Sequence, residues 1–229
     1  MTTIFMIETK CYVCGKNNRF PQSGPIMDAG TSRDLDGRPS GMGRSNIYMR
    51  VQRCINCGYC SLEASEGHES YPEIVKSDAY KAMLCSKDQS ETANAYLCCA
   101  LLLRYSQSWS EAGWSALHAA WICDDNKFSE SALRCRKLAL DFFTKAREGG
   151  SGGASFADSH SEEELLFIDI LRRLGEFEKA GKKCAEMIDK TDDSVVEIIL
   201  NYEKHLIEKQ DVKCHTFEQA QEMDENLSA

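Results

Sequence analysis

Two short cysteine motifs constrain this chain more than any other feature. They occupy residues 11–15 (Cys-Tyr-Val-Cys-Gly) and 54–58 (Cys-Ile-Asn-Cys-Gly), with 39 residues between the pairs. Two residues between cysteines allow one tight turn to present both sulfurs to a single ion, and the glycine permits the positive φ that completes the turn. Four thiolates satisfy a tetrahedral Zn²⁺ completely and leave no open position for catalysis. The motifs therefore predict one structural zinc ion, held by Cys11, Cys14, Cys54 and Cys57.

A fifth nearby cysteine, Cys60, leaves a second chemistry open. Cys54, Cys57 and Cys60 have the spacing of part of a ferredoxin motif, so an iron–sulfur or redox protein is an alternative. The fourth cysteine followed by proline, which that motif requires, is absent after Cys60. A redox-active pair would also favour a helix N-terminus in a thioredoxin-like context, and two matched pairs argue against it. Cys60 is expected to be a neighbour of the site, and His68 is a weaker candidate ligand; the sequence does not decide whether either joins the metal.

The N-terminus and the cysteine usage predict where the chain resides. Twelve cysteines would suggest disulfides in a secreted chain. However, the first ten residues lack the basic start, long apolar run and cleavage site of a secretory signal. No segment approaches the roughly 20 apolar residues of a membrane span. We therefore expect a cytoplasmic protein with no membrane partner. Five cysteines within predicted helices should be small buried hydrophobes: Cys98, Cys99, Cys123, Cys135 and Cys184.

The prolines divide the chain into two regimes. All four lie in the first 72 residues, and proline costs about 3 kcal/mol inside a helix, so the remainder is free to be helical. Apolar residues at helical spacing predict helices near 76–86, 91–106, 110–123, 129–147, 161–174, 177–190 and 194–209. Before them, residues 47–53 alternate apolar and polar side chains as a strand does, and residues 22–45 have the composition of a long loop.

The helices carry a weak internal repeat. Residues 171–177 (Leu-Arg-Arg-Leu-Gly-Glu-Phe) are typical of the turn of a tetratricopeptide hairpin, in which Gly175 ends one helix and Phe177 lies between the two. Trp109-Ser-Glu-Ala is a weaker version of the same turn. Ser161 and Glu164 have the spacing of a capping box, and the glycines of 149–153 predict a flexible linker. An irregular helical bundle is the alternative to a repeat array.

These features predict a mainly α fold. A small N-terminal β zinc-ribbon-like module is followed by an array of antiparallel tetratricopeptide-like helices. The predicted domains are a metal-binding module over residues 1–70, a helical domain over 71–210 and a polar, fraying tail over 211–229.

Charge separates the candidate partners. The formal net charge is −9, but residues 1–60 carry eight Lys/Arg against four Asp/Glu. Five arginines could make a nucleic-acid-binding zinc ribbon, which stands as an alternative function: Arg33, Arg38, Arg44, Arg50 and Arg53. The segment 33–39 predicts either a recognition surface or, as we favour, a turn held by local ion pairs and Asp side chains.

Motifs for catalysis are absent: no phosphate-binding loop, dinucleotide fingerprint, HExxH or nucleophile elbow occurs, and the five histidines are scattered. The chain is therefore predicted not to be an enzyme.

The segments 11–15, 51–59 and 171–177 together resemble a bacterial family catalogued only as a domain of unknown function. Its members join a two-CxxC zinc-ribbon-like segment to tetratricopeptide-like helices. The resemblance covers roughly residues 8–190 and implies the same fold and the same four cysteine ligands, but no activity. Cys60 and the glycine linker depart from the family pattern. Stacked helical hairpins generate surfaces that bind peptides, so we expect a protein-interaction scaffold or adaptor whose partner is a basic protein or peptide segment.

Overall fold

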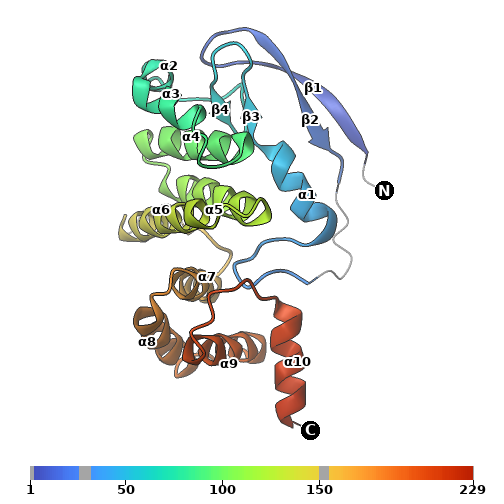
Figure 1. The fold of residues 1–229 in the computed structure, drawn as a ribbon, viewed down its shortest axis with the longest axis vertical. Coiled ribbons are helices and arrows are strands. Elements are labelled where there is room, and N and C mark those ends of the chain that lie inside the picture. Colours follow the sequence, from blue (N-terminus) through green and yellow to red (C-terminus); the bar gives the residue numbers. More distant parts are fainter. Residues whose placement is uncertain (1–2, 26–31, 150–154, 229) are drawn as a thin grey trace. The chain divides into compact units, whose positions relative to one another are not determined.

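The computed structural model describes residues 3–25, 32–149 and 155–228. Contacts divide the chain into two compact units (Figure 1). The first unit comprises Met1–Asp28 and Met42–Ala154, and the second comprises Ala29–Gly41 and Ser155–Ala229. The predicted fold class is confirmed: the described chain is mainly α, with small β-hairpins near the N-terminus followed by packed antiparallel helices. The predicted domain boundaries at residues 70 and 210 stay a prediction.

Two antiparallel hairpins begin the first unit. Strand β1 (Ile4–Lys10) pairs with β2 (Asn17–Ser23), and β3 (Gln52–Arg53) pairs with β4 (Cys60–Ser61). The turn of each hairpin contains one Cys-x-x-Cys motif. The sequence motifs therefore sit where a β-hairpin reverses direction, as a zinc-ribbon-like module requires.

The strand predicted over residues 47–53 is wrong. Helix α1 occupies Gly41–Arg50, and only Gln52 and Arg53 are extended. Arg44 and Tyr48, four residues apart, both bond the carboxylate of Asp125, at 3.0 and 3.2 Å. Side chains four residues apart are about 6 Å apart on one face of a helix but about 13 Å apart along a strand, so both can reach one carboxylate in a helix. Tertiary contacts thus override the local alternation of apolar and polar residues.

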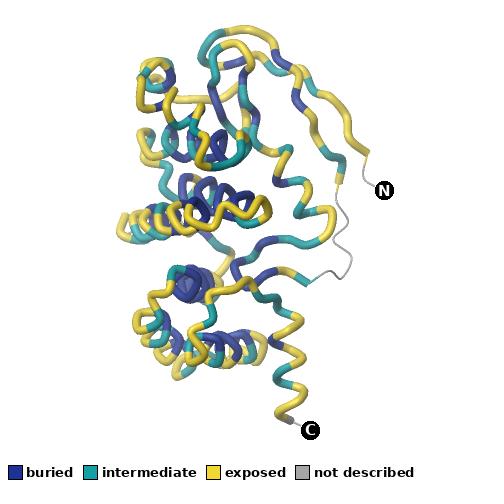
Figure 2. Tube along the Cα trace, in the orientation of Figure 1, coloured by how far each residue is buried: buried dark blue, intermediate teal, exposed yellow. Residues whose placement is uncertain are grey.

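Except for α2, the remaining helices of the first unit agree with the predicted ranges. They are α2 (Tyr71–Lys76), α3 (Asp78–Leu84), α4 (Glu91–Tyr105), α5 (Trp109–Asp125) and α6 (Ser129–Glu148). Helix α2 was not predicted from the sequence. Pro72 lies in its first turn, where a proline is tolerated. The buried face of each helix is visible in Figure 2. Cys11 and Cys54 share one hydrophobic core with Tyr80 and Leu102, so the hairpins and helices α2–α4 are one packed body.

The second unit contains helices α7 (His160–Arg173), α8 (Phe177–Ile188), α9 (Ser194–Glu208) and α10 (Phe217–Ser228). Their core includes Ile168, Leu200 and Leu206. The expectation that the tail frays is wrong, because α10 packs on α9 and Ala220 is fully buried. The cap of α7 is Ser159 rather than Ser161, and its hydroxyl accepts from the N–H of Glu162. The predicted glycine linker lies, from residue 150 on, outside the described residues.

One turn geometry recurs at four helix ends. The second residue after α4, α5, α7 and α9 has a positive φ, between 53° and 77°. In each turn the next N–H bonds the carbonyl five residues back, for example Glu176 to Leu171 at 2.9 Å and Phe128 to Cys123 at 2.9 Å. This is the Schellman motif. The four residues are Gln107, Lys127, Gly175 and Gln210. The predicted turn at Gly175 is confirmed, and the turn before Trp109 is the same structure without a glycine.

None of the helices in the described part of the chain is both long and apolar enough to span a membrane.

Candidate metal centre

The two cysteine motifs fold into matched turns. In the first, the N–H of Gly15 bonds the carbonyl of Cys11 at 2.8 Å; in the second, the N–H of Gly58 bonds that of Cys54 at 2.9 Å. Gly15 has φ +67° and Gly58 has φ +80°, so both use the conformation that the sequence predicted for a glycine. A second backbone hydrogen bond spans each turn, from the N–H of the first cysteine to the carbonyl five residues later. These bonds join Cys11 to Lys16 at 2.9 Å and Cys54 to Tyr59 at 2.8 Å.

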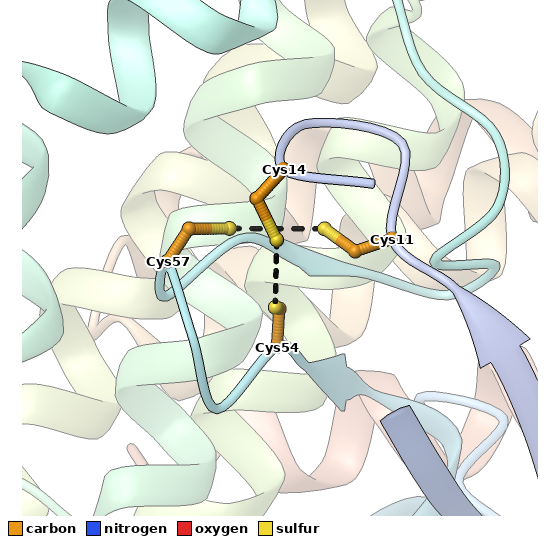
Figure 3. Close-up of side chains that lie close together, drawn as sticks. All are labelled: Cys11, Cys14, Cys54 and Cys57. Atoms are coloured by element: carbon orange, nitrogen blue, oxygen red, sulfur yellow. Dashed lines mark hydrogen bonds between the residues drawn. The ribbon is translucent and has the colours of Figure 1, made fainter. Parts of the chain in front are cut away.

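The four cysteine sulfurs converge on one point (Figure 3). Cys11 Sγ lies 3.7 Å from Cys57 Sγ, and Cys14 Sγ lies 3.6 Å from Cys54 Sγ. All four sulfurs lie within 4.8 Å of one another. A disulfide would hold two sulfurs at about 2.05 Å. Four thiolates around one ion, with metal–sulfur bonds of about 2.3 Å, stand roughly 3.8 Å apart. The arrangement therefore fits a site able to hold one metal ion.

Backbone N–H groups favour a charged sulfur in each turn. The N–H groups of Val13 and Cys14 face the Cys11 sulfur, and those of Asn56 and Cys57 face the Cys54 sulfur. Burial raises the pKa of the thiols of Cys11 and Cys57. At Cys54 burial acts in the same direction, but the N–H groups together with hydrogen bonds from the Cys14 and Cys57 thiols outweigh it and lower the pKa to about 6. Four adjacent thiols cannot all ionise without a cation among them, because like charges repel. A divalent ion supplies that compensation.

Burial closes the site to solvent from one side. Cys11 and Cys54 are each 1% exposed, whereas Cys14 and Cys57 are half-buried. With four protein ligands, a tetrahedral ion has no free position for a water or substrate. The site as built can organise the fold around it and offers no Lewis-acid surface to a reactant.

Two polar side chains that sequence reasoning missed hold the site in place. Asn18 is 4% exposed, and its side-chain oxygen accepts from the N–H of Ile55 at 3.1 Å, which joins the two turns. The fully buried Tyr80 of α3 accepts from the N–H of Cys60 and donates to the carbonyl of Gly58, both at 3.0 Å. Neither residue belongs to a motif. For Asn18 the only signal in the sequence is a polar residue close to a predicted metal turn, and Tyr80 has no such signal.

Cys60 and His68 are placed apart from the four sulfurs. Cys60 is fully buried, and its thiol donates to the carbonyl of Gly58 at 3.3 Å. The Nδ1 atom of His68 lies 2.9 Å from the hydroxyl of Ser70. Within the described ranges the four-sulfur group includes neither. The expectation that Cys60 is a neighbour of the site is therefore confirmed. An iron–sulfur site built on Cys54, Cys57 and Cys60 would need the Cys60 sulfur to turn away from this carbonyl.

The helical cysteines behave as predicted. The five named above are all at most 3% exposed. Burial raises the pKa of Cys99 and of Cys184 to about 12, so these thiols stay protonated. Core packing accounts for them.

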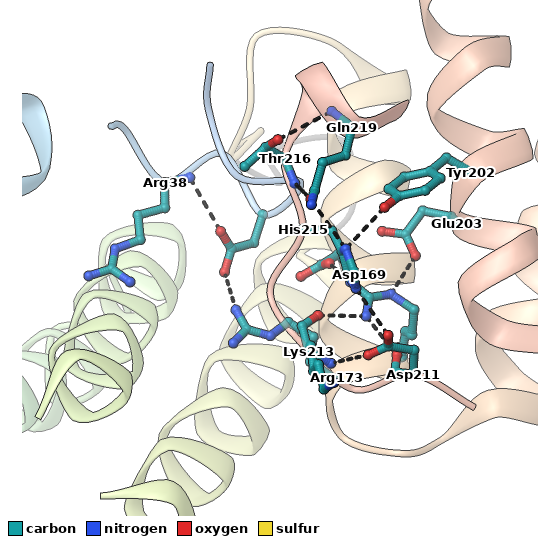
Figure 4. Close-up of polar contacts among 12 residues, drawn as sticks. Arg38, Asp169, Arg173, Tyr202, Glu203, Asp211, Lys213, His215, Thr216 and Gln219 are labelled. Carbon is teal, nitrogen blue, oxygen red and sulfur yellow. Dashed lines mark hydrogen bonds and ion pairs between the residues drawn. The ribbon is translucent and has the colours of Figure 1, made fainter. Parts of the chain in front are cut away.

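The segment 33–39 forms a turn that packs in the second unit, and its contacts include residues far away in the sequence. The N–H of Arg38 bonds the Asp36 carboxylate at 3.3 Å, as the local-turn prediction requires. The other Asp36 oxygen accepts from Arg173 of α7 at 3.2 Å, across 137 residues (Figure 4). Leu35 lies in the core of the second unit. The segment thus belongs to the second unit, and Asp36 is 1% exposed.

The five arginines of the nucleic-acid alternative are divided between the two units. Arg33 and Arg38 belong to the second unit, and Arg38 is 1% exposed. Arg44 pairs with Asp125 at 3.0 Å, and Arg53 lies 3.5 Å from Glu91. Phosphate binding requires exposed cations on one face. Arg38 cannot take part in such a face.

Comparison with known proteins leaves the family open. No protein-family model matches the chain, and neither does a curated protein or a solved structure.

Proposed function

We propose that this protein is a non-enzymatic, zinc-binding interaction scaffold, in which Cys11, Cys14, Cys54 and Cys57 hold one structural Zn²⁺. The observation that carries the proposal is the approach of four sulfurs to within 4.8 Å of one another. Tetrahedral sulfur donors suit zinc or iron best among biological metals. Zinc is preferred because the site is closed, matched in its two halves and without the further cysteine that a ferredoxin motif demands.

The ion would stabilise the first unit as a whole. It ties together two cysteine pairs that are separated by 39 residues of the chain, and the entropy of closing such a loop grows only slowly with its length. Tyr80 and the shared core around Cys11 and Cys54 then couple the ion to α2–α4. Metal binding of this kind contributes directly to the free energy of folding.

The helices would supply the interaction surface. Successive antiparallel helices joined by one recurring turn expose long faces suited to peptides. The second unit contains 11 Lys/Arg and 21 Asp/Glu, a formal charge of −10, whereas the rest of the chain has a formal charge of +1. A basic protein or peptide is the partner with complementary charge. The resemblance to the zinc-ribbon and helical-repeat family supports the same architecture, and that membership is part of the proposal.

The function is tested on the full chain, purified without added chelator or metal. Immobilised protein is exposed to matched synthetic peptides, one rich in Lys/Arg and one rich in Asp/Glu, and to duplex DNA and RNA. The proposal expects retention of the basic peptide alone, weakening as salt increases. Retention of nucleic acid with a steep salt dependence would favour the nucleic-acid alternative. Equal retention of both peptides would contradict a charge-selective scaffold.

A further inference from the structure

A groove of about 600 Å³ opens on the second unit, where α7 begins and α8 ends beside the start of α9. Its lining is apolar where the helices pack: Leu165, Met187, Val196 and Ile199 reach it and are each at most 9% exposed. Val195, also in the lining, is 59% exposed. The groove therefore combines a packed apolar floor with an apolar side chain still open to solvent.

Carboxylates dominate the sides of the groove. Five acidic residues line it against two lysines: Glu162, Glu164, Glu186, Asp192 and Asp193, with Lys183 and Lys190. Lys183 is occupied by Glu164, at 2.9 Å. In the described chain, neither Glu186 nor Asp192 forms an ion pair. The unpaired charge at the groove is thus mainly negative.

The helix N-termini at the groove do not offer an anion site. The Ser159 hydroxyl accepts from the N–H of Glu162, 3.2 Å away, and caps α7. The Asp193 carboxylate accepts from the N–H groups of Val195 and Val196, at 2.8 and 3.3 Å, and caps α9. With these donors satisfied by the protein itself, the carboxylates set the sign of the local field. The groove repels phosphate and attracts cations.

We propose that this groove docks a basic peptide segment of the partner protein, with one apolar side chain against the floor and Lys or Arg side chains beside Glu186 and Asp192. Charge complementarity selects this occupant, since the groove and the whole second unit are acidic. The apolar floor supplies contact area, and the rim charges supply selectivity. This inference rests on the proposed scaffold function and assigns that function a surface.

The test selects peptides from a random peptide library displayed on phage, using the full-length protein. Enriched peptides are synthesised, labelled and titrated by fluorescence anisotropy against the wild type and two variants. The groove variant carries Glu186→Lys and Asp192→Lys. The control carries Glu178→Lys and Glu208→Lys, two exposed positions of the same unit outside the groove lining, so that both variants change the net charge equally. Circular dichroism and thermal melting establish that both variants are folded.

The expected peptides combine Lys or Arg with an apolar residue and bind the groove variant about tenfold more weakly than the control. Peptides that bind the groove variant and the wild type equally would overturn the groove assignment while leaving the scaffold function standing. Enrichment of acidic peptides would overturn the assignment as well. If no peptide is enriched over uncoated support, the scaffold function itself fails together with the groove.

Discussion

The side-chain oxygen of Asn18 accepts a hydrogen bond of 3.1 Å from the backbone N–H of Ile55. This bond joins the strand that leaves the first cysteine turn to the apex of the second. A second bond, from the N–H of Tyr12 in the first turn to the carbonyl of Ala64 just after β4, at 2.8 Å, also ties the two hairpins together. Groups behind metal ligands commonly change metal affinity by 10- to 100-fold when removed.

Substitution Asn18→Ala should therefore speed metal loss. We expect the zinc-release rate to rise about tenfold, because the turns are no longer held at the spacing that the ion needs. Release is followed by the absorbance of a chromogenic chelator added in excess. Asn17→Ala is the matched control, since Asn17 is the exposed neighbour on the same strand. Equal release rates for the two variants would mean that the bond has no part in holding the site.

Removal of the metal should loosen the first unit selectively. The hairpins and α2–α4 share one core, to which Cys11 and Cys54 belong, so loss of the ion should open that core. Hydrogen–deuterium exchange with mass spectrometry, before and after chelation, is the measurement. We expect faster exchange in peptides from 4–23 and 52–105 and unchanged exchange in peptides from 160–208. Uniform loss of protection across both units would contradict this coupling.

The second unit should lose stability as pH rises. Burial raises the pKa of Glu203 to about 8, and the nearby Asp169 carboxylate adds to this effect against the opposing charge of Arg172. In the unfolded chain the pKa returns to about 4.5. Between these values the folded state binds the extra proton, so the free energy of unfolding falls by up to about 1.4 kcal/mol per pH unit.

The measurement is urea unfolding by circular dichroism between pH 5 and pH 8, for the wild type and Glu203→Gln. The glutamine variant cannot titrate at this position and should show a shallower slope. Parallel slopes in the two proteins would show that Glu203 is not the titrating group. Arg172, which also donates to the carbonyls of Asp211 and Lys213 at 2.7 and 2.8 Å, is unchanged in both.

Substitution Lys127→Gly should stabilise the protein. Lys127 has φ +63°, in the left-handed region that costs a non-glycine residue about 1 kcal/mol. We expect the free energy of unfolding to rise by up to about 1 kcal/mol, because relief of this strain exceeds the added entropy of glycine in the unfolded chain. All three tryptophans lie in α5, so fluorescence during urea unfolding reports on this region. Gly175→Ala, at the equivalent turn with φ +77°, should destabilise the chain. A loss of stability in Lys127→Gly would show that contacts of the lysine side chain stabilise the fold by more than its left-handed backbone conformation destabilises it.

The sequence predicted the parts of this molecule that depend on local spacing. The two cysteine turns and their glycines follow from short motifs, and helices α4–α9 follow from apolar periodicity and turn residues. Gly175 was recognisable because glycine adopts positive φ without strain, whereas the same turn at Gln107 and Lys127 carries no such mark.

Elements fixed by distant partners could not be predicted in this way. Residues 47–53 alternate like a strand, yet Asp125, 81 residues beyond Arg44, helps to hold residues 41–50 as a helix. Asp36 is buried because Arg173 pairs with it across 137 residues. Asn18 is one of several polar residues near the first motif, and only the position of Ile55 distinguishes it. Local patterns contain no information on such pairings.

The most direct test of the metal centre is elemental analysis of the purified full chain by inductively coupled plasma mass spectrometry, together with four single Cys→Ser variants at Cys11, Cys14, Cys54 and Cys57. A Cys60→Ser variant is the control, because Cys60 lies outside the four-sulfur group. We predict one zinc ion per chain in the wild type and in Cys60→Ser, with zinc reduced or lost in each of the four ligand variants. A folded wild-type protein that contains no metal, or that retains full zinc in all four ligand variants, would contradict the account.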